Sequence, residues 1–313
     1  MRRGEVLAVL LFISGLSGIL CRAQEAESSG SFAFAVYGDC RTGHEIHRQI
    51  VAQMLALKPA FVVGAGDYVT KGDDKSDWRT FADITGKMRE TVRFYPAKGN
   101  HDVERKGRGL YDKYLKLPTN TGQMRYYSFD HGDRHFVVLD STGSLAAGGE
   151  QYRWLQADLK AAEGKSRHRF VVLHHPLYTL IPLRKAETDA RRRQLLPLLK
   201  EFKVCAVFAG HDHYFFFTRR DGVPQVVTGG GGAPLYPLNP FQARPGDKWG
   251  LYRHFLWVEV SPDQVKVSVR DTSGQTKEEF QLCSHGKKTG GTGAPSHRFD
   301  REEAPLCGDR SCW

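Results

Sequence analysis

The sequence predicts a layered α/β domain, and three observations support this fold class. Five short runs of apolar residues, rich in Val, Phe and Ala, have the length and composition of strands buried on both faces of a sheet. Segments with helical periodicity lie between the runs. This alternation of strand and helix indicates parallel strands joined by crossover helices.

The predicted elements follow one another in a regular order. FAFAVY, starting at Phe32, is the first strand, and the helix predicted from Gly43 to Lys58 places Ile46, Ile50 and Met54 on one face. The next four strands are the runs FVVG, FYP, FVVL and VCAVFA. QVVT is also typical of a strand, and HFLWVEV, VKVSVRD and EEFQLCS predict antiparallel strands near the end of the domain.

Each of the five runs ends in a residue type that binds metals. Loops leaving the carboxyl ends of strands in α/β sheets converge on one edge, so these side chains should meet in space. Together they offer two carboxylates, one amide oxygen and three imidazoles, a set suited to Fe, Mn, Zn or Co rather than calcium. The sequence therefore predicts a two-metal hydrolytic site formed by Asp39, Asp67, Asn100, His174, His211 and His213.

The ordered motifs GDCR, GDYV, GNHD, VVLHHP and GHDH resemble the calcineurin-like metallophosphoesterase superfamily, in particular its purple-acid-phosphatase-like branch. The resemblance covers Phe32 to Tyr214. It implies a layered β-sandwich core flanked by helices, in the order αββα. It also implies a binuclear, acid-phosphatase-like phosphoric ester hydrolase that binds two divalent or mixed-valence ions of Fe, Mn or Zn. Its substrate would be a small anionic phosphate ester, preferably a monoester, attacked by a metal-activated hydroxide.

The resemblance also assigns a role to each residue by its position. Asp39 and His213 would bind the first metal and Asp67 would bridge both metals. The remaining three, Asn100, His174 and His211, would complete the second site.

The family pattern also settles two choices within the motifs. His174 is preferred to its neighbour His175 because the family ligand stands two residues before a proline, here Pro176. His101 would contact the phosphoryl oxygen or protonate the leaving alkoxide, oriented by Asp102.

The first metal site departs from the family pattern at two positions. Arg41 stands where most of the superfamily has a histidine, and Thr70 stands where purple acid phosphatases have a tyrosine. Water or His44 are the alternatives for the missing ligand, or the first metal is weakly held. A guanidinium matches two phosphate oxygens, so Arg41 is a candidate for substrate binding. The alternative function is a non-catalytic phosphate- or metal-binding protein with a degenerate first site.

Several other features carry weaker predictions. The glycines 229–232 are interpreted either as a loop beside the metals or as a tight connection between strands. His254 is a candidate for the substrate edge. The three arginines 191–193 predict a solvated helix face. Among the cysteines, Cys205 is expected to be inert in a core strand, whereas Cys307 could pair with Cys312, or either of the two with Cys283.

The chain divides into three parts. Residues 1–23 combine two early arginines with a short apolar stretch and predict a signal peptide, residues 24–283 the catalytic domain, and residues 284–313 a loosely ordered tail. The expected location is secreted or periplasmic, with no transmembrane helix in the mature chain. The formal charge of +10 favours anionic substrates, and no aromatic-basic motif indicates nucleic-acid binding.

Overall fold

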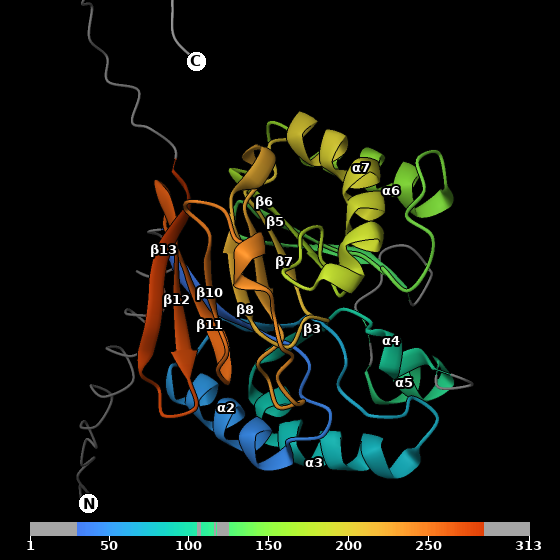
Figure 1. Ribbon diagram of the computed structural model, residues 1–313, viewed down its shortest axis with the longest axis vertical. Helices are drawn as coiled ribbons and strands as arrows, with labels where there is room; N and C mark the ends of the chain where they lie inside the picture. The colour runs from blue at the N-terminus through green and yellow to red at the C-terminus, as the bar shows by residue number, and fades with distance from the viewer. Residues whose placement is uncertain (1–29, 105–107, 116, 118–124, 285–313) are drawn as a thin grey trace, which may run out of the picture.

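The computed structural model describes residues 30–104, 108–115, 117 and 125–284 (Figure 1). The predicted signal peptide, the predicted tail beyond Ser284, and Cys307 and Cys312 all lie outside these residues. No helix of the described part combines the length and the apolar character that crossing a membrane requires.

Two β-sheets stack on each other. The first has the strand order β13-β12-β11-β1-β2-β3, in which β1, β2 and β3 run parallel and the other neighbours antiparallel. Its strands are β1 (Phe32–Tyr37), β2 (Phe61–Gly64), β3 (Arg93–Pro96), β11 (His254–Val260), β12 (Gln264–Asp271) and β13 (Thr276–Ser284).

The second sheet has the order β10-β8-β9-β7-β6-β5-β4, with a parallel centre formed by β5, β6, β7 and β9. Its strands are β4 (Tyr127–His131), β5 (Arg134–Val138), β6 (His168–Leu173), β7 (Ala206–Ala209), β8 (Phe215–Thr218), β9 (Gln225–Thr228) and β10 (Lys248–Gly250).

Helices cover the outer faces of both sheets, which gives the four layers αββα seen in Figure 1. The first sheet is covered by α2 (His44–Ala56) and α3 (Lys75–Thr91), and the second by α6 (Glu150–Ala162) and α7 (Lys185–Glu201). The shorter helices are α4 (Asn100–Val103), α5 (Arg108–Tyr114) and the 3-10 turns η1 (Pro182–Arg184), η2 (Arg220–Gly222) and η3 (Pro240–Gln242).

Side chains along the strands of the second sheet point alternately to its two faces, so each strand packs against both neighbouring layers. In β6, Phe170 and Val172 face the space between the sheets, whereas Val171 and Leu173 face α6 and α7. Phe34 of β1 meets Phe170 across the sheet interface, with ring centroids 6.0 Å apart. Strands buried on both faces need apolar residues at consecutive positions, which is why these runs were readable in the sequence.

The predicted fold class is confirmed, with one refinement. The five motif-bearing strands do not share one sheet: β1, β2 and β3 belong to the first, and β6 and β7 to the second. The functional edge is therefore formed where two stacked sheets end side by side.

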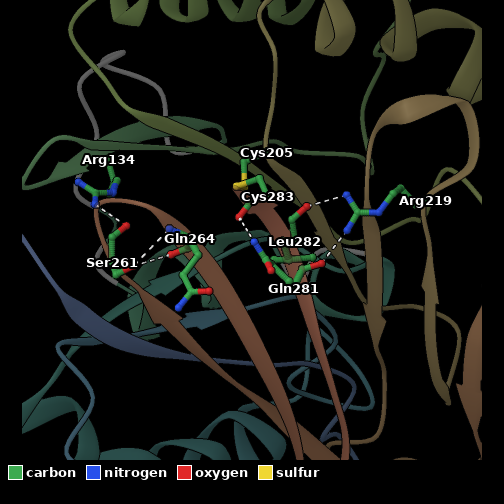
Figure 2. The surroundings of a disulfide bond; sticks show 8 residues. All are labelled: Arg134, Cys205, Arg219, Ser261, Gln264, Gln281, Leu282 and Cys283. Carbon is green, nitrogen blue, oxygen red and sulfur yellow. Dashed lines mark hydrogen bonds between the residues drawn. A yellow bond between two sulfur atoms is a disulfide. The ribbon is translucent and has the colours of Figure 1, made fainter. Parts of the chain in front are cut away.

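A disulfide joins the two sheets on the side shown in Figure 2. Cys205, directly before β7, is bonded to Cys283 of β13. The expectation that Cys205 is inert is wrong, and so is a pairing of Cys283 with Cys307 or Cys312. Strand β13 ends beside the entry to β7, which places two cysteines distant in sequence within bonding reach.

The arginines of α7 differ from the expectation of a solvated face. Arg191 and Arg192 are half-buried and donate to the carbonyls of Pro176 and Leu177, 2.9 and 3.4 Å away. Only Arg193 is exposed. These two half-buried guanidiniums thus fix the loop that follows β6 and begins with His174.

Candidate metal centre

The loops after β1 and β2 hold Asp39 and Asp67 in a left-handed backbone conformation, each with φ of 58°. His211, after β7, shares this conformation with φ of 69°. Asp and His tolerate it better than bulkier residues do, but it still costs energy, and such residues cluster at functional sites. The turns are fastened together, because the amide of His211 donates to Oδ2 of Asp39 at 2.9 Å.

Asp67 lies at the centre of the predicted ligand set. Its Oδ1 is 3.4 Å from Nε2 of His174, and the same nitrogen is 3.2 Å from Oδ1 of Asn100. Asp39 approaches from the other side, with Oδ1 3.3 Å from Nε2 of His213. The structure therefore brings all five motifs to one place, from both sheets.

Two of the histidines are oriented for ligation. Nδ1 of His174 donates to the carbonyl of Ala65 at 2.7 Å, and Nδ1 of His213 donates to the carbonyl of Pro234 at 2.6 Å. A proton held on Nδ1 leaves the lone pair on Nε2, which faces the carboxylates. Anchoring the far nitrogen in this way is the usual arrangement of metal-binding imidazoles.

The donor set fits transition-metal ions. Oδ1 of Asp39 is buried and has no hydrogen-bond partner among the described residues, and a buried carboxylate oxygen needs a cation or a donor. Ligand atoms of Asp39, Asp67 and His174 lie within 4.8 Å of one another. Mixed carboxylate and imidazole donors suit Fe, Mn and Zn.

Electrostatic coupling ties Asp67 to His174. Burial alone would lower the pKa of His174, but the Asp67 carboxylate raises it to about 9. Burial alone would likewise raise the pKa of Asp67, yet His174 and His101 hold it below its usual value. Asp67 and His174 thus favour each other's charged form, and a metal ion bound between them would supply the positive charge instead.

His211 stands between two other histidines. Its ring centroid is 5.1 Å from that of His174 and 4.4 Å from that of His175, and ligand atoms of the three lie within 4.8 Å of one another. His174 is the one that contacts Asp67, in agreement with the choice made from Pro176. His175 is nevertheless part of the cluster, with Nδ1 2.9 Å from the hydroxyl of Ser141.

The contacts of Asp102 differ from the expected orienting role. Its carboxylate accepts the backbone amides of Asp67, Tyr68 and Gly99 at 2.9, 2.7 and 2.8 Å. His101 instead donates from Nδ1 to the carbonyl of Thr70 at 2.9 Å. Asp102 lies in the short helix α4 and has a short side chain, so its carboxylate reaches these backbone amides rather than the His101 ring. It therefore fixes the loop carrying Asp67, and Thr70 orients His101.

Arg41 lies beside the centre. Its Nε is 3.8 Å from Oδ2 of Asp67, and its Nη2 donates to the hydroxyl of Tyr236 at 3.3 Å. Tyr236 stacks on His213 with ring centroids 3.8 Å apart. The guanidinium of Arg184 lies over the same tyrosine ring, at 4.9 Å.

Sequence reasoning missed Tyr236 and Arg184. Tyr236 follows the glycine loop by a few residues and belongs to no motif, and Arg184 lies in the turn η1. The sequence pointed only to the glycine loop, residues 229–232. Gly231 donates to the carbonyl of Gly38 at 3.0 Å, and a Cβ at Gly231 would come within 2.2 Å of that oxygen. The glycine loop therefore lies against the Asp39 turn, in agreement with the first of its two interpretations.

Two other histidines are not placed as proposed. His44 begins α2 with an exposed side chain, whereas Asp39 and Asp67 are buried, so the placement does not favour it as the missing ligand. His254 is fully buried and its Nδ1 is 3.0 Å from the carbonyl of Tyr252, so the prediction of a substrate-edge residue is wrong. A Cβ at Gly230 would come within 2.1 Å of the His254 ring, which shows that this ring packs under the glycine loop.

Comparison with known proteins agrees with this geometry. Purple acid phosphatase 23 of Arabidopsis thaliana is 27% identical over 165 residues, which are 50% of this chain and 36% of that protein. Purple acid phosphatase 7 of the same plant is 23% identical over 89% of this chain and 96% of its own length. The chain thus spans little more than a third of the first of these relatives.

A solved structure shows the same fold. Purple acid phosphatase PPD1 from yellow lupin (Lupinus luteus) superposes with a TM-score of 0.73 at 19% identity, covering 82% of this chain and 54% of that one. The family model of the calcineurin-like phosphoesterases matches residues 32–215, more than half of the chain. The chain therefore belongs to the calcineurin-like phosphoesterase family, on its purple-acid-phosphatase-like branch.

Proposed function

We propose that this protein is an exported, binuclear metal-dependent phosphoesterase that prefers phosphate monoesters. The observation that carries the proposal is the donor set in which His174 contacts both Asp67 and Asn100, while His213 contacts Asp39. Asp39 and His213 would hold the first ion, Asp67 would bridge, and Asn100, His174 and His211 would hold the second. Two such ions supply Lewis acidity and a water of lowered pKa.

The chain's own residues would do the rest. Arg41 would bind non-bridging phosphate oxygens through its planar fork. His101 holds one proton on Nδ1, against Thr70, so a proton on its other nitrogen would be the one given to the leaving oxygen. Its backbone amide donates to Oδ1 of Asp67 at 3.0 Å, which ties the acid to the bridging ligand.

The preference for monoesters is supported by positive charge near the centre. Arg41 and Arg184 both contact Tyr236, the first at its hydroxyl and the second over its ring. A terminal monoester phosphate carries up to two negative charges, whereas a diester carries one, so two guanidiniums favour the monoester. Arg184 also donates to Oδ1 of Asp212, which offsets part of its charge.

A second candidate function is a non-catalytic protein that binds one metal or a phosphate. The observation in its favour is the position of Arg41. Its guanidinium lies beside Oδ2 of Asp67, one of the residues assigned to the incomplete first site. In that case the guanidinium replaces the charge of the first ion.

One experiment separates the two candidates. The purified protein is analysed for bound metal by mass spectrometry and assayed with p-nitrophenyl phosphate and bis(p-nitrophenyl) phosphate. Two ions per chain and faster hydrolysis of the monoester support the enzyme. One ion without turnover supports the binding protein, and neither metal nor turnover contradicts both.

The exported location rests on residues 1–23 alone. Amino-terminal sequencing of protein recovered from outside the producing cell, where a start at Gln24 is expected, tests it. Recovery only from the cytosol with Met1 or Arg2 at the amino terminus would contradict export.

A further inference from the structure

A basic groove lies over the disulfide. The cavity has a volume of about 540 Å³, and both Cys205 and Cys283 line it. Among the described residues, its wall includes five cationic side chains and no aspartate or glutamate; the five are Arg167, Arg169, Lys200, Lys203 and Arg219. We call these residues and the cavity between them the basic groove.

Most of this positive charge has no carboxylate partner at hydrogen-bond distance in the part of the chain that the structure describes. Arg219 donates to the carbonyls of Gln281 and Leu282, at 2.6 and 2.8 Å, and these bonds can be followed in Figure 2. Arg169 donates to the carbonyls of Phe202 and Ser166, at 2.7 and 3.0 Å. Carbonyl partners satisfy the N–H groups of a guanidinium but leave its net charge in place.

Nearby acids account for only part of the charge. Arg167 is paired with Asp133 at 3.3 Å. Glu163 lies close enough for Arg169 and Lys203 to lower its pKa, but its contact at 2.7 Å is with Lys160, outside the groove. The positive charge of the groove therefore exceeds the negative charge that surrounds it.

Capping of α7 does not explain the whole cluster. Arg169 binds the carbonyl of Phe202, which ends that helix, and Lys200 lies in its last turn. A helix end carries about half a negative charge, which such residues stabilise. Arg219 follows β8 and donates to carbonyls of β13, so it does not cap α7.

A second cavity of the same protein, of about 390 Å³, is lined by both positive and negative side chains. It is also lined by several cations, but Asp189 and Asp221 stand among them. Arg192 and Lys185 both pair with Asp189 there. No aspartate or glutamate of residues 30–104, 108–115, 117 and 125–284 lines the basic groove, and this difference points to an external anion.

We propose that the basic groove is a second anion-binding site, separate from the metal centre, for a ligand that carries several clustered phosphate groups. Its volume falls in the range of small-molecule sites, and the four cations other than Arg167, which is paired with Asp133, exceed what one phosphate group needs. Both a soluble polyphosphorylated molecule and a lipid headgroup with several phosphates have this chemistry.

The test uses inorganic tripolyphosphate as the probe, with binding to the intact protein measured by calorimetry. The double variant Lys200→Gln and Lys203→Gln removes two exposed charges without touching the core. The matched control is Lys75→Gln with Lys87→Gln, two exposed lysines on α3. We expect affinity for the groove site to fall roughly fivefold to tenfold in the groove variant only.

The metal centre can also bind the probe, so turnover of p-nitrophenyl phosphate is measured in parallel. Unchanged KM and kcat in the groove variant, together with weaker tripolyphosphate binding, support a separate site. Equal binding of the probe by the groove variant and the α3 control would overturn the proposal. The result does not depend on whether the metal centre is catalytic, because the groove variant leaves that centre intact.

A second arm distinguishes the source of the phosphates. Phosphatidylcholine vesicles with and without phosphatidylinositol bisphosphate are sedimented with the wild-type protein and both variants. Lysine-dependent binding to the phosphoinositide vesicles assigns the groove to a headgroup. Tripolyphosphate binding without vesicle binding assigns it to a soluble ligand. Absence of both contradicts the site.

Discussion

Nε2 of His174 lies 3.4 Å from Oδ1 of Asp67, although one residue follows a strand of the second sheet and the other a strand of the first. The contact therefore joins the two halves of the sandwich. It exists only because both sheets end at the same edge, and Ala65, next to the Asp67 turn, also accepts from His174. The centre is a property of the sheet interface rather than of either sheet.

Replacement of Asp67 by Asn should remove bound metal and lower turnover by more than about 100-fold, because a bridging ligand outweighs the outer residues whose loss costs 10- to 100-fold. Metal content and hydrolysis of p-nitrophenyl phosphate are measured together. Asp83→Asn, on the exposed side of α3, is the matched control and should change neither. Retention of two ions by the Asp67 variant would refute its bridging position.

Replacement of Arg41 by Ala should raise KM for a phosphate monoester roughly tenfold or more, since a charge-assisted contact contributes about 1.5–3 kcal/mol. Arg48→Ala, exposed on α2, controls for loss of one positive charge and should leave KM unchanged. Tyr236→Phe should give a smaller rise, because it removes only the acceptor that holds Arg41. Wild-type kinetics for Arg41→Ala would exclude a role in substrate binding.

Loss of the disulfide should destabilise the protein without altering the metal centre. Cys205 and Cys283 are 78 residues apart, and closing a loop of that length corresponds to about 4 kcal/mol in the chain-entropy model. Urea unfolding of Cys283→Ser should show a lower midpoint than the wild type. Reducing agent should lower the wild-type midpoint to the same level and leave the variant unchanged; a wild type insensitive to reduction would contradict the prediction.

The pH dependence of stability should include a contribution from His135. This buried side chain contacts Asp130 and Asp158 at 2.7 and 2.9 Å. Burial lowers its pKa, but the hydrogen bonds that it donates to the two carboxylates outweigh burial and raise it. A raised pKa stabilises the fold fully below the unfolded value of about 6.5 and loses that stabilisation as pH rises through the folded pKa.

His135→Gln should therefore be most destabilising, by about 1–3 kcal/mol, near pH 5, and the difference from the wild type should narrow in alkaline solution. Thermal unfolding at a series of pH values measures this. His44→Gln, an exposed histidine on α2, should show no such trend. A destabilisation that grows with pH would mean that His135 is neutral in the folded protein.

The strands that carry the centre could be predicted because a polar residue follows each of them and all except the edge strand β3 are largely buried. Phe170 and Val171 show the reason, since neighbours in one strand face different layers and both must be apolar. The division into two sheets could not be predicted from the runs alone. It depends on which strands pair, and apolar composition says nothing about partners.

The remaining parts of the site depend on tertiary contacts that leave no local pattern. Tyr236 reaches His213 only because the glycine loop packs against the turn at Asp39. Asp102 sits in the GNHD motif, but its hydrogen bonds to Asp67 and Tyr68 span two strands' loops. Cys205 looked like one more apolar residue of its run, and only the course of β13 reveals its partner.

The left-handed backbone at Asp39, Asp67 and His211 restricts how this centre could be re-engineered. Few amino acids accept that conformation, chiefly Gly, Asn, Asp and His. Swapping in a β-branched or bulky residue would distort the turn before any question of coordination arose. Attempts to shift metal selectivity at these three positions therefore have few amino acids to choose from. Wider variation is open only at residues such as His174, whose backbone has no such constraint.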